Sequence, residues 1–301
     1  MLYSGKDLRK LIIPLIIEQI LAIAVGMADT IMVSAAGEAA VSGVSLVDTV
    51  NILLINVFSA LATGGAVVSG HFLGKKKRED ACKSAWQILL FATLLAFVIS
   101  VIFITAHDPL LRLMFGKIED DVMKASKTYL IITTYSFVAL AIYNSCAALF
   151  RAMNESKVTM WVSLLMNVIN VVGNAICIYG LHMGVAGVAI PTTISRYVAA
   201  VVIFLLMFQS KKEINLCGQI TWKFNGSLIK KILYIAIPNG MENSMFQLGK
   251  ILVMSAVATM GTSAIAANAV TGTIANWNNL PGFAINLAIV SVVSVCVGAG
   301  R

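Results

Sequence analysis

Two acidic residues lie inside the first long apolar segment of the chain, Glu18 and Asp29. They are eleven residues apart, which on an α-helix is three turns plus about 20°, so both carboxylates would share one helix face, roughly 16 Å apart. A charged side chain in mid-membrane costs about 2.5–3.5 kcal/mol on insertion scales and usually faces a bundle interior or an ion pathway. We therefore expect both acids to point into a helix bundle, with Asp29 as a candidate site for a proton or a cation.

Three asparagines follow the spacing i, i+3, i+7, at Asn167, Asn170 and Asn174. This spacing places the three amides on one face of a helix. Asparagine in a membrane often joins neighbouring helices by hydrogen bonds, which is one explanation of the pattern. The other is a cation site, because amide oxygens combined with a carboxylate and a hydroxyl form a set of hard oxygen ligands that suits sodium. The spacing alone is compatible with both.

Both groups belong to a chain whose composition excludes a soluble domain. Of its 301 residues, 59% are hydrophobic and 12% are charged, and the mean hydropathy is +0.89. Apolar stretches of about 20 residues, the length that spans a bilayer, recur along the whole sequence. The sequence predicts an all-α integral membrane protein, a polytopic helical bundle. The predicted helices are 9–34, 46–73, 84–106, 126–150, 158–180, 185–208, 231–258 and 268–297.

The basic residues gather on alternate loops. Sixteen of the 22 lysines and arginines lie at the N-terminus, in the loops 74–83, 151–157 and 209–231, and at Arg301. By the positive-inside rule this side is cytoplasmic, so we expect a multi-pass protein of the cell membrane with a cytoplasmic N-terminus. This topology explains the net charge of +8, and no nucleic-acid partner is expected. The five cysteines are scattered and have no metal-binding spacing.

The sequence repeats weakly at an offset of 224 residues. The residues that coincide are rare ones for a membrane helix: Pro14 with Pro238, Glu18 with Glu242, Gly37 with Gly261, and Gly74 with Gly298. A parallel duplication of six helices is typical of transporters. We therefore predict a six-helix N-terminal lobe at 1–210, a cytoplasmic linker at 211–230, and the first two helices of a second lobe at 231–301, with four further helices missing from a truncated chain.

The sequence contains four motifs in order: the pattern Pro14…Asp29-Thr30…Gly37 and the stretches INVVGNAICIYG (169–180), GVAGVAIPTTISR (184–196) and PNGMENSMFQLGKIL (238–252). These four motifs resemble those of the multidrug and toxic compound extrusion (MATE) family of transporters. The resemblance covers essentially the whole chain, with the motifs in the family's order. It implies a fold of twelve helices in two six-helix lobes, of which this chain would hold one full lobe and a third of the other.

The resemblance also implies a cation site in the first lobe. The family's cation-site acid corresponds to Asp29, and its motif positions in the fifth and sixth helices correspond to Asn170, Asn174 and Thr192. Some members carry an acid at the position of Asn174. An amide there leaves fewer titratable groups, which favours sodium as the coupling ion, or a proton carried by Asp29 alone.

Other polar residues inside the predicted helices are candidates for the substrate cavity or its gate: Glu18, Glu242, Asn167, Arg196 and Asn276. Glu18 and Glu242 hold equivalent places in the two copies and suit a cavity for cationic compounds, or a structural role in closing the inner gate. Arg196 could neutralise an acid across the lobe, or form a purely structural pair.

From these features we expect a cation-coupled antiporter that exports drug-like, cationic small molecules by alternating access, with Na+ or H+ as the coupling ion and no cofactor. The alternative is a flippase for lipid-linked oligosaccharides or peptidoglycan precursors, whose cavity should be basic enough to hold pyrophosphate. An intramembrane enzyme is not expected, because the sequence has no HExxH, Ser/Lys, paired-Asp or GxGD motif. The expected partners are the bilayer and small-molecule drugs, and the protein is expected to be a monomer.

Overall fold

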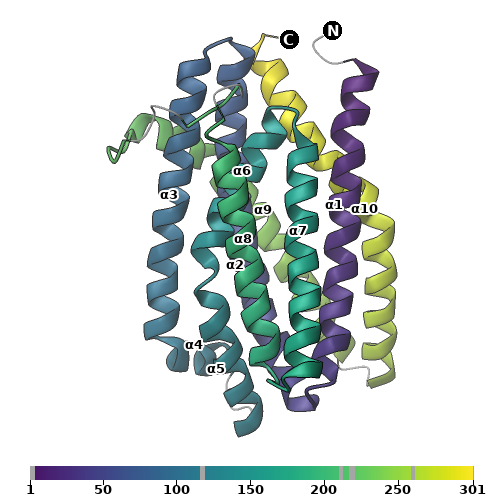
Figure 1. The fold of residues 1–301 in the computed structure, drawn as a ribbon. Coiled ribbons are helices and arrows are strands. Elements are labelled where there is room, and N and C mark those ends of the chain that lie inside the picture. The colour runs from purple at the N-terminus through teal and green to yellow at the C-terminus, as the bar shows by residue number, and fades with distance from the viewer. Residues whose placement is uncertain (1–3, 116–118, 210–212, 217–220, 259–261, 301) are drawn as a thin grey trace.

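The computed structural model describes residues 4–115, 119–209, 213–216, 221–258 and 262–300, and within these ranges it contains helices and no strand (Figure 1). Most side chains between positions 248 and 276 also lie outside the description. The helices are α1 (Gly5–Ser34), α2 (Glu38–Gly74), α3 (Arg78–Thr105), α4 (His107–Phe115), α5 (Asp120–Thr134), α6 (Phe137–Ala152), α7 (Ser156–Ala175), the π-helical turn η1 (Ile176–Gly180), α8 (Ala186–Leu206), α9 (Gly226–Ala258) and α10 (Thr262–Gly298). The predicted all-α fold is confirmed.

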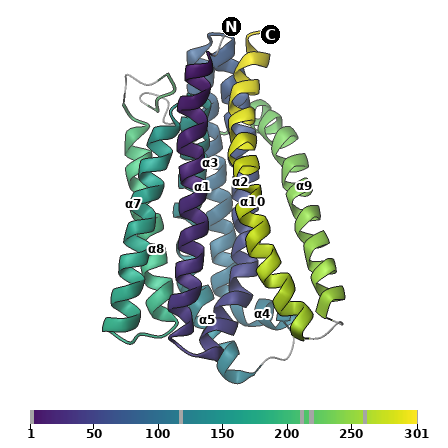
Figure 2. The same cartoon turned by 90° about the vertical axis from the view of Figure 1, so that its right-hand side faces the viewer.

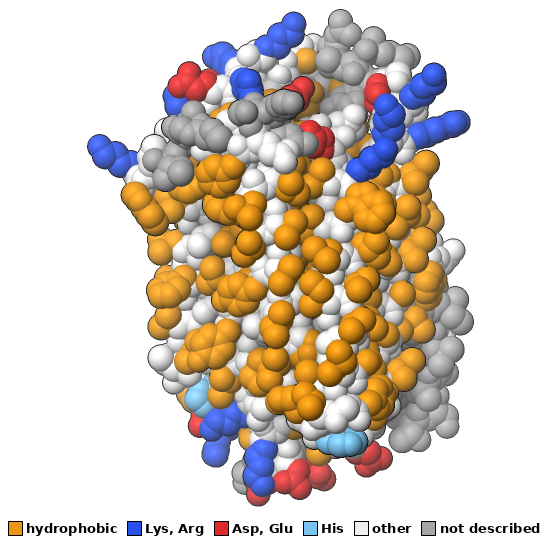
Figure 3. All heavy atoms as spheres, viewed as in Figure 1, with side chains coloured by type: hydrophobic (Ala, Val, Ile, Leu, Met, Phe, Trp, Pro, Cys, Tyr) orange, Lys and Arg blue, Asp and Glu red, His pale blue; other side chains and the backbone are white. Residues whose placement is uncertain are grey.

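On the face shown in Figure 3, a broad apolar band lies between two charged ends of the bundle. Six helices of the described chain are long and apolar enough to cross a bilayer, or seven if one bent pair counts as a single span. The six are α1, α2, α3, α7 with η1, α8, and the part of α10 from Trp277. α9 contains the predicted span 231–258 and begins five residues before it, but some of its side chains lie outside the description, so its membrane crossing stays a prediction. The protein is a multi-pass membrane protein.

The fourth predicted helix, 126–150, is wrong in one respect, because it consists of two helices. α5 and α6 meet at an angle of 51°. Hydroxyl side chains next to the break bond to the backbone of their own segment: Thr134 Oγ1 donates to the carbonyl of Leu130 at 2.6 Å, and Ser136 Oγ to that of Thr133 at 2.6 Å. Such bonds compete for backbone carbonyls that accept the hydrogen bonds of the helix, and they favour a bend.

α2 lies at the centre of the bundle and packs against α3, α5, α6, α9 and α10. Figure 2 shows α7 and α8 on one side of α1 and α2, and α9 on the other side. α7 also packs against both α1 and α8. α1, α7 and α8 therefore form a three-helix group, and this group holds the candidate site described below.

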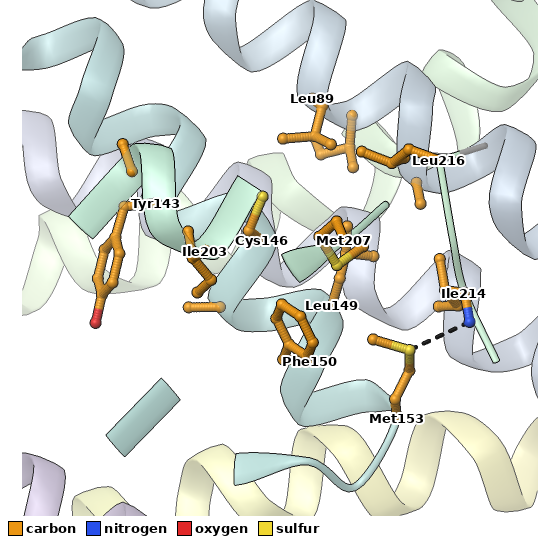
Figure 4. Close-up of a cluster of buried hydrophobic side chains, with 14 of the residues drawn as sticks. Leu89, Tyr143, Cys146, Leu149, Phe150, Met153, Ile203, Met207, Ile214 and Leu216 are labelled. Atoms are coloured by element: carbon orange, nitrogen blue, oxygen red, sulfur yellow. Dashed lines mark hydrogen bonds between the residues drawn. The ribbon is translucent and has the colours of Figure 1, made fainter. Parts of the chain in front are cut away.

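The largest hydrophobic cluster includes residues of the predicted linker 211–230 (Figure 4). Ile214 and Leu216 are fully buried in it. The N–H of Ile214 donates to Met153 Sδ at 3.2 Å, and the indole of Trp86 on α3 donates to a backbone carbonyl of the same segment at 2.7 Å. The described parts of this segment are therefore anchored on α3 and α6.

The helix boundaries repeat at the offset of the sequence repeat. α2 ends at Gly74 and α10 at Gly298, which is 224 residues later, and α1 and α9 also end 224 residues apart. The two glycines meet: a Cβ on Gly74 would overlap the backbone of Val295, and a Cβ on Gly298 would overlap that of His71. His71 and Val295 are equivalent positions of the repeat. A two-fold relation between the copies produces such a reciprocal contact.

Candidate cation site

α7 and α8 pack closely because small residues lie at their interface. Gly173 on α7 faces Pro191 on α8, where an added Cβ would come within 2.6 Å of the Cβ of the proline. A Cβ on Gly187 would likewise lie 3.2 Å from the backbone of Cys177. Small residues are the usual means by which helices approach each other in membranes. The close approach brings the amides of α7 within reach of Thr192.

The four residues predicted to bind a cation form one hydrogen-bonded chain. Asn174 Nδ2 donates to Asp29 Oδ1 at 2.8 Å and lies 3.4 Å from Asn170 Oδ1. Asn170 Nδ2 donates to Thr192 Oγ1 at 2.9 Å. Residues from α1, α7 and α8 thus meet at one point, and we call these four residues the Asp29 cluster.

One acceptor in the Asp29 cluster has no donor. Asn174 is fully buried, and its Oδ1 has no hydrogen-bond partner in the part of the chain that the structure describes. Buried polar atoms without a partner are rare and cost about 1–3 kcal/mol each. An unused carbonyl oxygen beside a carboxylate is an arrangement that a small cation can satisfy. The π-helical turn η1 begins two residues after Asn174, and π-turns frequently occur at functional sites.

A second acid, Asp48 on α2, lies near the Asp29 cluster. Its Oδ1 accepts hydrogen bonds from Tyr129 Oη at 3.1 Å and from Asn51 Nδ2 at 3.3 Å, and its charge acts on Asp29. The predicted site did not include Asp48, because its link to Asp29 depends on how α1 and α2 pack. The available signal was an acid at the start of a predicted membrane helix, 46–73.

Arg196 on α8 connects the Asp29 cluster with the break between α5 and α6. Its Nη1 donates to Ser136 Oγ at 2.8 Å, and its charge acts on both Asp29 and Asp48. The next residue, Tyr197, donates its hydroxyl to a backbone carbonyl at the break at 2.8 Å. α8 therefore contacts the break on one side and contributes Thr192 to the Asp29 cluster on the other. The predicted gate role of Arg196 stays a prediction.

Glu18, the other acid of α1, forms a buried ion pair. Arg151 Nη1, near the end of α6, lies 3.2 Å from Glu18 Oε1, and the two side chains are only 13% and 10% exposed. Thr159 on α7 donates its hydroxyl to Glu18 Oε2 at 3.0 Å. Sequence analysis missed Arg151 because it placed the residue in a charged loop, 151–157. We call Glu18 and Arg151 the Glu18–Arg151 pair. Together with the hydrogen bond from Thr159, this pair joins α1 to α6 and α7.

The remaining residues predicted for the cavity or gate have different surroundings. Asn167 on α7 is buried, and its Nδ2 has no partner among the described residues. Glu242 on α9 is exposed. The side chain of Asn276 lies outside the described residues. Their roles in a cavity or gate stay predictions.

Several known proteins are similar to this chain. The uncharacterized transporter YisQ of Bacillus subtilis is 28% identical over 91% of the chain, and a probable multidrug resistance protein NorM of Thermotoga maritima is 25% identical over 98% of it. A solved structure of a multidrug resistance MATE family transporter in an outward-facing conformation matches 98% of the chain with a TM-score of 0.89, at 22% identity. The chain spans 60%, 64% and 65% of the length of these three proteins.

The family model called MatE matches residues 14–176, which is more than half of the chain. The matched region contains both acids of α1, the break between α5 and α6, and the amides of α7. The motifs in the sequence predicted the same family. The chain therefore belongs to the MatE family of multidrug and toxic compound extrusion transporters.

Proposed function

We propose that this chain carries the ion site of a cation-coupled efflux transporter, which exports drug-like, cationic small molecules by alternating access. The Asp29 cluster binds the coupling ion. Ion binding changes how α1, α7 and α8 pack, and this change is linked to substrate release. The names of the related proteins, which describe transporters and multidrug resistance proteins, support the same class of function.

The observation that carries this proposal is the unused Oδ1 of Asn174 beside the Asp29 carboxylate. Asp29 supplies one negative charge, and Asn174 supplies a neutral oxygen for which no donor in the described chain competes. Asn170 and Thr192 continue the chain of polar atoms on the far side of Asn174. A cation bound here would take the place of the missing donor, which makes ion binding favourable.

The set of ligands favours sodium over a proton. A proton needs only the Asp29 carboxylate, whereas the amide and hydroxyl oxygens contribute binding energy only to a metal cation. Asn174 has no charge, so the Asp29 cluster carries a single negative charge, which matches a monovalent ion. Asp48 and Arg196 lie near the cluster and have opposite charges, so together they leave this balance unchanged.

The contact between α2 and α10 suggests which end of the bundle opens. Gly74 and Gly298 meet near the end of the bundle that carries both chain termini (Figure 2). With the N-terminus on the cytoplasmic side, as the positive charges favour, this contact closes the cytoplasmic end. The two copies of the repeat would then separate at the extracellular end, where the substrate leaves.

A flippase is less well supported by the interior of the bundle. Binding a pyrophosphate requires clustered basic groups that are free to pair with it. The two arginines inside the described bundle, Arg151 and Arg196, each lie beside acids instead.

The efflux scheme needs neither a second copy of the protein nor a nucleic acid. That the protein is a monomer and that it binds no nucleic acid both stay predictions.

The test is ethidium efflux from membrane vesicles that contain the intact gene product, with the sodium and pH gradients imposed separately. We expect the sodium gradient to drive efflux and Asp29→Asn to abolish it. Glu38→Gln is the matched control, because it removes an exposed acid at the start of α2 and should leave efflux unchanged.

Binding of radioactive sodium to the purified protein separates ion binding from transport. We expect Asp29→Asn to lose this binding and Glu38→Gln to keep it. Efflux that does not depend on the sodium gradient would exclude sodium as the coupling ion. Unchanged efflux in Asp29→Asn would remove the Asp29 cluster from the mechanism.

A further inference from the structure

A basic pocket lies between the end of α2 and the first turns of α9. Its volume is about 490 Å³. The lining combines positive charge with apolar and aromatic surface, and includes Lys75, Lys230, Lys231, Tyr234, Phe72 and Ile235. The pocket shares no residue with the Asp29 cluster or with the Glu18–Arg151 pair.

The three lysines of this pocket have no counter-charge in the described chain. None of them takes part in an ion pair between described residues. No aspartate or glutamate is among the lining residues that the structure describes. The pocket therefore presents three unpaired positive charges, which is the electrostatic requirement for binding an anion.

The pocket lies where a membrane helix meets water. Lys75 directly follows the last residue of α2, and Lys230 and Lys231 lie in the second turn of α9. Tyr234, one turn further, is 82% exposed, and tyrosine is enriched at the level of lipid headgroups. Basic pockets between membrane helices at this level bind the headgroups of anionic lipids.

An apolar stripe leads away from the lysines along α9. Lys230, Tyr234, Ile237, Met241 and Met245 are spaced by four, three, four and four residues, so they lie on one helix face. The last three are 55%, 63% and 66% exposed, and they line an apolar groove of about 460 Å³ between α9, α2 and α3.

The length of this stripe matches one leaflet of a bilayer. Met241 lies eleven residues after Lys230, a rise of roughly 16 Å along the helix. Half of a hydrocarbon core is about 15 Å thick. A headgroup held by the lysines would therefore place an acyl chain along Ile237 and Met241, down to the middle of the membrane.

We propose that this seam binds one anionic glycerophospholipid, with its phosphate at Lys75, Lys230 and Lys231 and an acyl chain on the apolar stripe of α9. Because α2 and α9 belong to different copies of the repeat, the bound lipid touches both. The proposal rests on the charge, position and length of the seam and does not depend on the coupling ion or on the exported compound.

The first test is native mass spectrometry of the purified intact gene product, released from micelles with equal amounts of phosphatidylglycerol and phosphatidylcholine. The variant carries Lys75→Gln, Lys230→Gln and Lys231→Gln. Each pocket lysine that pairs with the lipid phosphate should strengthen binding of the anionic lipid roughly fivefold, so we expect the preference for phosphatidylglycerol to fall by at least about tenfold. The control removes three exposed charges at the same end, with Lys6→Gln, Lys76→Gln and Lys77→Gln, and should keep the preference.

The second test locates the lipid in vesicles. A photoreactive benzoylphenylalanine replaces Tyr234 in one protein and Trp161, an exposed residue of α7, in another. We expect adducts with phosphatidylglycerol to exceed those with phosphatidylcholine at position 234 and the two lipids to react equally at position 161. The proposal would be overturned if position 234 reacted equally with the two lipids. It would also be overturned if the triple variant and its control kept the same preference for phosphatidylglycerol.

Discussion

The two acids of α1 lie on the same helix face, but their partners differ. Glu18 has a counter-charge, Arg151, and a hydroxyl donor, Thr159, so both of its oxygens are used. Asp29 accepts a hydrogen bond from the neutral amide of Asn174, whose own oxygen has no partner in the described chain. The Glu18–Arg151 pair is complete without a ligand, whereas the Asp29 cluster has oxygen atoms left for an ion.

This difference shows that a buried acid in a membrane helix takes its role from the neighbouring helices. A paired buried charge is costly to break, because removal of one partner leaves the other unpaired in a medium of low dielectric. A buried carboxylate without a cation in contact instead favours binding of one. Substitutions at the Glu18–Arg151 pair should therefore change stability, and substitutions in the Asp29 cluster should change ion dependence.

The largest expected effect on ion dependence is that of Asp29→Asn. The amide has the size of the carboxylate and still hydrogen-bonds, but it carries no charge for a cation. We expect loss of sodium-driven ethidium efflux, while the midpoint of thermal unfolding in detergent stays the same or rises because a partly buried charge is gone. A fall in the midpoint as large as that caused by Arg151→Met would contradict the separation of the two regions.

The largest expected effect on stability is that of Arg151→Met. The variant leaves the Glu18 carboxylate buried and unpaired, which should cost about 3–5 kcal/mol. The measurement is thermal unfolding of the purified protein. The double variant Glu18→Gln, Arg151→Met should recover most of this loss, because neither charge then remains. Lys157→Met, an exposed neighbour, serves as the control, and a double variant no more stable than Arg151→Met would show that the ion pair is not the cause.

The residues of the Asp29 cluster were largely predictable, whereas the partner of Glu18 in its ion pair was not. Asn170 and Asn174 lie on one helix face because they are four residues apart, and this is a local property of the sequence. Asp29 stood out as an acid inside an apolar segment, and family motifs added Thr192. The contact of Glu18 with Arg151 depends on tertiary packing of α1 against α6. In the sequence, a charge at the end of an apolar run fits a loop equally well.

The fold shows the same division between local and tertiary information. The positions of the long helices follow from the length of the apolar runs, which the bilayer sets. The break between α5 and α6 depends partly on Thr193 of α8, whose hydroxyl donates to the carbonyl of Ile132 at 3.0 Å. Burial of Ile214 and Leu216 involves too few apolar residues to give a periodic pattern. Neither feature has a signal in the sequence alone.

Asn174→Asp gives the Asp29 cluster a second carboxylate. Two acids in contact do not both ionise easily, so protons would compete with sodium for the site. We expect the sodium concentration for half-maximal efflux to rise several-fold as the pH is lowered from about 8 to about 6, and to change less in the unmodified protein. Asn167→Asp puts an acid on the same face of α7 away from Asp29. An equal pH response in that control would contradict the assignment of Asn174 as an ion ligand.

The smallest effects come from a matched pair of substitutions, Thr192→Val and Thr159→Val, which remove one hydroxyl from each region without changing side-chain size. Thr159→Val takes a donor from the Glu18 carboxylate and should cost about 1.5–3 kcal/mol of stability, with the sodium dependence of efflux unchanged. Thr192→Val removes an oxygen from the Asp29 cluster and two neutral hydrogen bonds, one accepted from Asn170 and one donated to the Val188 carbonyl, each worth about 0.5–1.5 kcal/mol. It should raise the sodium concentration for half-maximal efflux. If both variants shift the sodium dependence alike, the two acids of α1 belong to one coupled network, and the contrast between a closed ion pair and an open ion site is wrong.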